Sequence, residues 1–130
     1  MASGRITSAP TFHAVQAEAV KPLIAALEAE RWTFDADRKT VASGISVSHP
    51  PRLQQCVDVV KLSDGTGIAV DDPAMLSWQK RLASEAGIFC EATSAAAFAG
   101  LEAMIARGDI SDDAQVLVPI TGSGLKEPLT

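Results

Sequence analysis

Three short apolar runs along the chain are candidates for buried strands. They occupy residues 11–16, 67–70 and 115–120, and polar residues, glycine or proline flank each of them. Apolar runs of this length without polar alternation are typical of strands that are covered on both faces, as in a parallel sheet. The last run ends in Thr121, a hydroxyl residue followed by Gly122.

Between these runs, apolar residues recur at helical spacing and predict four helices. The helices are expected over residues 19–30, 51–62, 74–86 and 93–107. The side chains expected to face the core from the first three are Leu23, Ile24, Leu27, Leu53, Cys56, Val57, Val60, Met75, Trp78 and Leu82. The fourth helix has an almost bare face made of Ala95, Ala96, Ala97, Ala99, Gly100 and Ala103, which lets another backbone come close.

The residues at the helix ends support these boundaries. Asp71 or Asp72 can begin the third helix, and Thr93 or Ser94 can cap the fourth. Gly108 follows the fourth helix, where glycine closes helices in the left-handed conformation.

The order of the elements predicts the fold class. Strands alternate with helices, and residues 31–51 are irregular and read as a long ordered loop. Such an order favours an α/β fold with a mostly parallel sheet and crossover helices. Thr121 then lies at the carboxyl end of a strand, where open α/β sheets bind ligands, so it is the best candidate for a functional residue.

Composition and charge exclude several classes of function. The chain has 130 residues, 47% of them hydrophobic, and a net charge of −5, so no basic stripe is available to neutralise a nucleic-acid backbone. No apolar run approaches the ~20 residues of a membrane helix. The spacing of the two cysteines and the polar first residues indicate no oxidising compartment, which predicts a cytoplasmic location. Residues 1–4 are typical of a cloning remnant.

The last third of the chain carries a resemblance to a known family. Two motifs carry it: Gly-Ile-Phe-Cys-Glu-x-x-Ser-Ala-Ala-Ala, which begins at Gly87, and Thr-Gly-x-Gly-Leu-Lys-Glu-Pro, which begins at Thr121. Together they resemble the carboxyl-terminal part of threonine synthase. That family belongs to the fold type II enzymes that depend on pyridoxal 5'-phosphate (PLP). The resemblance is looser upstream, through residues 40–45 and 14–18. It implies that residues 5–130 are the C-terminal part of the large domain, a partial three-layer αβα structure.

The resemblance also implies three cofactor-binding residues. Thr121 matches the threonine of the family's Thr-Gly-His-Gly motif, which contacts the pyridine nitrogen of PLP, although Ser123 stands where that family has histidine. Ala42 lies in the portion expected beside the cofactor ring, and its alternative reading is a buried small residue in a turn. Glu91 approaches the cofactor pocket in the family, and its alternative is a carboxylate that stabilises the start of a helix.

Two family motifs are missing from the sequence. The Schiff-base lysine in its Ser-x-Lys-x-Arg context and the Gly-rich loop for the cofactor phosphate do not occur, so no catalytic residue is assigned. We expect a carboxyl-terminal fragment that is inactive alone, with the remainder of the parent chain as its partner and a homodimeric parent. Some relatives bind a metal ion near Glu18, but Pro22 and Ile24 occupy the positions where its ligands would fall, so no metal is expected.

The reaction implied by the resemblance is the conversion of O-phosphohomoserine and water to threonine and phosphate. Two alternatives remain open at the level of the sequence. The first is a related PLP-dependent dehydratase or replacement enzyme that acts on another small amino acid. The second is a non-catalytic α/β module that binds a partner, without membrane or nucleic acid, through its alanine-rich face.

Overall fold

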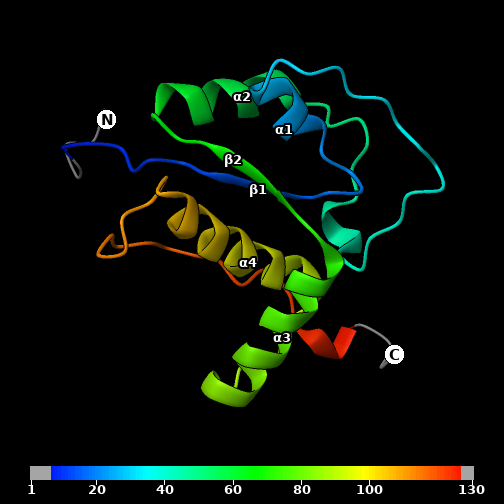
Figure 1. The fold of residues 1–130 in the computed structure, drawn as a ribbon, viewed down its shortest axis with the longest axis vertical. Coiled ribbons are helices and arrows are strands. Elements are labelled where there is room, and N and C mark those ends of the chain that lie inside the picture. The colour runs from blue at the N-terminus through cyan, green and yellow to red at the C-terminus, as the bar shows by residue number, and fades with distance from the viewer. Residues whose placement is uncertain (1–6, 127–130) are drawn as a thin grey trace.

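Two parallel strands lie between helices in the computed structural model, which describes residues 7–126 (Figure 1). Strand β1, Ala14–Ala17, pairs with β2, Gly67–Val70, over their whole length. Helices α1, Pro22–Leu27, and α2, Leu53–Leu62, lie on one face of the sheet, and α4, Ala92–Arg107, lies on the other. The predicted α/β class with a parallel sheet is confirmed.

Helix α1 is shorter than predicted, and a side chain of the neighbouring strand binds its first backbone amides. Its first amides have no cap from Lys21, the residue before the helix. Instead, the side-chain oxygen of Gln16 in β1 accepts hydrogen bonds from the backbone N–H groups of Leu23 and Ile24, at 2.8 and 3.1 Å. The helix ends at Leu27 because Ala29 adopts a positive φ of 58°. The link from β1 to α1 is therefore a buried polar contact that satisfies two helix amides.

The predicted ends of the later helices are mostly confirmed. Helix α3, Asp72–Ala86, is capped by the Asp71 carboxylate, which accepts a hydrogen bond from the N–H of Ala74 at 2.9 Å. Gly108 closes α4 with φ 82°, the left-handed conformation that favours glycine.

Two further predictions about the helices are wrong. Glu91, not Thr93 or Ser94, occupies the N-cap position of α4, and its side chain makes no capping hydrogen bond. The hydroxyl groups of Thr93 and Ser94 lie within the first helical turn and bind other segments of the chain. Cys56, predicted to face the core from α2, is exposed, whereas Val57 and Val60 are buried.

The third predicted strand is also wrong. Residues 115–120 form no strand in the described part of the chain, because no second strand lies beside them to complete a ladder of hydrogen bonds. The segment returns from the carboxyl end of α4, where Asp109 N–H donates to Met104 O, to its amino end, where Thr121 contacts Ser94. Val116, Leu117 and Ile120 are exposed, Leu117 by 90%.

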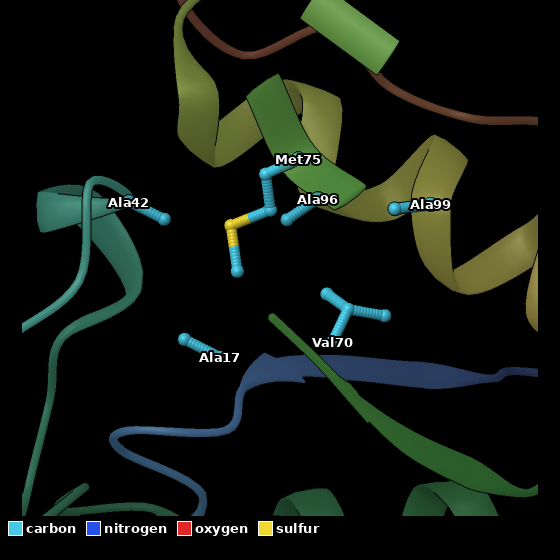
Figure 2. Packing of buried hydrophobic residues seen from close by; sticks show 6 residues of the cluster. All are labelled: Ala17, Ala42, Val70, Met75, Ala96 and Ala99. Atoms are coloured by element: carbon cyan, nitrogen blue, oxygen red, sulfur yellow. The ribbon is translucent and has the colours of Figure 1, made fainter. Parts of the chain in front are cut away.

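The hydrophobic core lies between the carboxyl end of the sheet and helices α3 and α4. Figure 2 shows the fully buried side chain of Met75 surrounded by small side chains from four other segments. They are Ala17 of β1, Val70 of β2, Ala42 of the long loop, and Ala96 and Ala99 of α4. A long flexible thioether fills the space that these short side chains leave.

The alanine-rich face of α4 is covered by the chain itself. Ala95, Ala96, Ala99 and Gly100 are buried. A Cβ atom added at Gly100 would lie 2.3 Å from a methyl group of Val15 in β1, so glycine allows the helix to pack directly on the strand. Ala97 and Ala103, the other members of this face, are half-buried, so most of the surface on which the interaction-module alternative depended is covered.

Candidate functional site

The site predicted around Thr121 lies at the amino end of α4. Residues 89–91 pair with residues 122–124 through an antiparallel bridge between Cys90 and Ser123. The N–H of Glu91 donates to the carbonyl oxygen of Gly122 at 3.1 Å, and the N–H of Gly124 donates to that of Phe89 at 3.0 Å. This short pairing, and not a strand over residues 115–120, fixes the turn that follows Thr121.

The hydroxyl group of Ser94 holds Thr121 in place. Ser94 is 2% exposed. Its Oγ accepts hydrogen bonds from the backbone N–H groups of Thr121, at 3.0 Å, and Gly122, at 3.2 Å. It also lies 3.2 Å from Thr121 Oγ1. Thr121 itself is an exposed residue, and its hydroxyl group lies against Ser94 in a partly buried contact.

Glu91 lies against the same turn. One carboxylate oxygen is 3.0 Å from the ammonium nitrogen of Lys126, and the Glu91 side chain is 14% exposed. A Cβ atom added at Gly122 would lie 2.0 Å from the other carboxylate oxygen, so only glycine allows the carboxylate to cross the turn. Glu91 thereby links the start of α4 to the last described residues.

Ala42 belongs to a loop that two contacts attach to the same end of the fold. The Asp72 carboxylate accepts hydrogen bonds from the Thr40 hydroxyl group, at 2.6 Å, and from the N–H of Val41, at 3.0 Å. After Ala42, the N–H of Gly44 donates to Thr93 Oγ1 on the first turn of α4, at 3.1 Å. The Ala42 side chain is fully buried and points towards Met75 in the core (Figure 2).

The structure thus brings together two of the three predicted residues directly. Thr121 and Glu91 lie on one turn at the amino end of α4, and Ala42 approaches this end from the core side. Its predicted contact with a cofactor ring stays a prediction. Sequence reasoning missed Ser94 as the anchor of Thr121 and Lys126 as the partner of Glu91. Ser94 could have been found as a polar residue within an alanine-rich helical turn, where a buried hydroxyl group requires partners.

The rest of the described chain adds no metal-binding cluster. Between residues 7 and 126, no three His, Cys, Asp or Glu side chains are grouped so that they could hold a metal ion. None of the helices in this range combines the length and the apolar character that crossing a membrane requires.

Comparison with known proteins identifies the class to which this chain belongs. The family described as pyridoxal-phosphate dependent enzyme matches residues 2–122, nearly the whole chain. The chain therefore belongs to the family of PLP-dependent enzymes.

Particular relatives are threonine synthases. The chain is 32% identical to the threonine synthase of Methanocaldococcus jannaschii over 97% of its own length, and 34% identical to that of Methanosarcina acetivorans over 98%. It spans about a third of the length of these relatives, 32% in both cases. A solved structure, the T.th. threonine deaminase, shares the fold with a TM-score of 0.63 at 20% identity, over 91% of this chain and 36% of that chain.

The residues at the amino end of α4 fit a contact with PLP. The aromatic nitrogen of PLP needs a polar partner, and the Thr121 hydroxyl group is a neutral, exposed partner that the chain holds at a fixed position. The nearby carboxylate of Glu91 is occupied by Lys126 and is directed across Gly122. A neutral hydroxyl group held at a fixed position is therefore compatible with a partner for that nitrogen.

Proposed function

We propose that this chain forms the carboxyl-terminal part of the large domain of a PLP-dependent enzyme that converts O-phosphohomoserine and water to threonine and phosphate. The family membership and the threonine synthase relatives support the proposal. The single observation that carries it is the hydroxyl group of the exposed residue Thr121, which lies against buried Ser94 at the amino end of α4.

PLP, when bound, supplies an electron sink for the α-carbon of the amino-acid substrate. The role proposed for this chain is to bind and tune the ring. A neutral hydroxyl partner leaves the ring nitrogen unprotonated, whereas an aspartate would hold it protonated and deepen the sink. Thr121 is therefore suited to elimination and replacement reactions, in which the cofactor ring must withdraw less electron density from the substrate.

The catalytic lysine and the phosphate-binding glycine loop are proposed to come from the remainder of a longer polypeptide. The sequence contains neither motif, and the chain spans about a third of its relatives. Apolar side chains that are exposed here support a missing neighbour: Leu117 is 90% exposed and Leu62 is 86% exposed. We propose that the chain alone is inactive, and that the complete protein is cytoplasmic and dimeric.

The test uses the polypeptide encoded by the complete reading frame that contains this chain. We expect it to bind PLP and to release phosphate from O-phosphohomoserine. Replacing Thr121→Asp should shift the absorption band of the bound cofactor and lower turnover about tenfold or more, the effect of roughly 1.4 kcal/mol on a barrier. The control Thr121→Ser keeps the hydroxyl group and should keep both properties close to those of the unchanged protein.

Two outcomes would contradict the proposal in different ways. An unchanged spectrum and turnover in Thr121→Asp would remove Thr121 from the site. Release of ammonia from threonine, without release of phosphate from O-phosphohomoserine, would replace the proposed reaction by that of a dehydratase.

A further inference from the structure

The hydrogen bonds of Ser94 determine which way its own hydroxyl hydrogen points. A serine oxygen has two lone pairs and one hydrogen. The N–H groups of Thr121 and Gly122, at 3.0 and 3.2 Å, occupy the two lone pairs. The hydrogen of Ser94 is then available for the remaining neighbour, Thr121 Oγ1, at 3.2 Å.

This arrangement also determines the polarity of the Thr121 hydroxyl group. Because Thr121 Oγ1 accepts the hydrogen of Ser94, its own hydrogen is free to be donated to another group. Within residues 7–126, Ser94 is the polar group with which this hydroxyl forms a hydrogen bond. Thr121 is exposed, so its hydrogen can be offered to an acceptor that approaches from outside the chain.

We propose that Ser94 is a positioning residue that makes the Thr121 hydroxyl group a hydrogen-bond donor. The inference rests on the proposed function, in which the acceptor is the aromatic nitrogen of PLP. Ser94 does not touch the ligand in this proposal; it acts through Thr121. If the chain offered the opposite polarity, two lone pairs would face the lone pair of an unprotonated ring nitrogen, and the contact would be repulsive.

The burial of Ser94 explains why its hydroxyl group keeps one orientation. Ser94 is 2% exposed, so water does not compete for its lone pairs, and both N–H donors come from consecutive residues of one turn. Reversing the hydroxyl group of Ser94 would leave a backbone N–H without an acceptor. Because this contact is partly buried, the loss of the acceptor is unfavourable and favours one orientation of the hydroxyl group.

The test is a double-mutant cycle in the polypeptide encoded by the complete reading frame. Ser94→Ala should weaken PLP binding about fivefold, the effect of losing one neutral hydrogen bond of ordinary net strength, and should shift the absorption band of the bound cofactor. Thr121→Val removes the hydroxyl group and should have a similar effect. In the Thr121→Val background, Ser94→Ala should change neither property further.

A second readout does not use the cofactor. In the 130-residue chain, Ser94→Ala should accelerate amide hydrogen exchange at Thr121 and Gly122 severalfold, because both amides lose their acceptor. The matched control is Ser84→Ala, an exposed helical serine whose hydroxyl group donates to Arg81 O. This control should leave the exchange rates of Thr121 and Gly122 and the binding of PLP unchanged.

The outcomes separate this inference from the proposed function. If the unchanged polypeptide binds no PLP, the proposed function fails, and the inference about ring contact fails with it. If PLP binds and Ser94→Ala weakens binding equally in the presence and absence of the Thr121 hydroxyl group, Ser94 does not act through Thr121. Unchanged binding and spectrum in Ser94→Ala would equally overturn the inference.

Discussion

Strand β2 and the segment 115–120 have similar apolar sequences and opposite environments. β2 pairs with β1 along its whole length, and its last residue, Val70, belongs to the core around Met75. The segment 115–120 has no neighbouring strand in the described chain, and Leu117 at its centre is 90% exposed. An apolar run therefore predicts a segment that other residues bury. It does not say whether those residues belong to this chain.

The largest expected effect comes from the core at the end of β2. Replacing Met75→Ala leaves a cavity between several segments of the chain and should lower the free energy of unfolding by about 2–5 kcal/mol. The control Leu62→Ala removes a side chain that is 86% exposed and should change the free energy of unfolding by less than about 0.5 kcal/mol. Urea denaturation followed by circular dichroism measures both. Equal effects would show that the cluster around Met75 is not the core.

A smaller effect is expected where α4 packs on β1. Gly100→Ala introduces a Cβ atom that would lie 2.3 Å from a Val15 methyl group, so it should lower the free energy of unfolding by about 1–3 kcal/mol. The intrinsic preference of helices for alanine acts in the opposite direction by about 0.5–1 kcal/mol. The exposed position Ala106 provides the matched control, because Ala106→Gly should be destabilising for that intrinsic reason alone.

Thermal and urea unfolding of Gly100→Ala and Ala106→Gly measure the two changes in the free energy of unfolding. If Gly100→Ala stabilises the chain, α4 and β1 are not in direct contact at Val15. The packing of the small-residue face would then have to be revised.

The smallest effect is expected in the segment 115–120. Leu117→Ser should change the free energy of unfolding of the 130-residue chain by less than about 0.5 kcal/mol, because the side chain has little contact to lose. Ile68→Ser, the matched change in β2, should be clearly destabilising, since Ile68 packs against the core. A large loss of stability in Leu117→Ser would show that the segment is already covered within this chain.

The candidate site was partly predictable. The family resemblance pointed to Thr121 and Glu91, and the structure places both at one turn beside α4. The role of Ser94 as anchor was missed because capping rules assign a hydroxyl residue near a helix start to its own helix. Its actual partners, Thr121 and Gly122, lie 27 and 28 residues away in sequence. No local rule can identify a partner at that distance.

Local sequence patterns were sufficient to locate the four helices, although not the bounds of the first, to place Asp71 and Gly108 at helix ends, and to show that residues 67–70 are extended. These features follow from side-chain periodicity and from the conformational preferences of single residues, which act over a few positions. The three-dimensional arrangement was needed to see that residues 115–120 lack a partner strand within residues 7–126 and that Ser94 binds the turn at Thr121. Strand pairing and buried polar contacts depend on which distant groups meet in space, and no short window of sequence contains both partners.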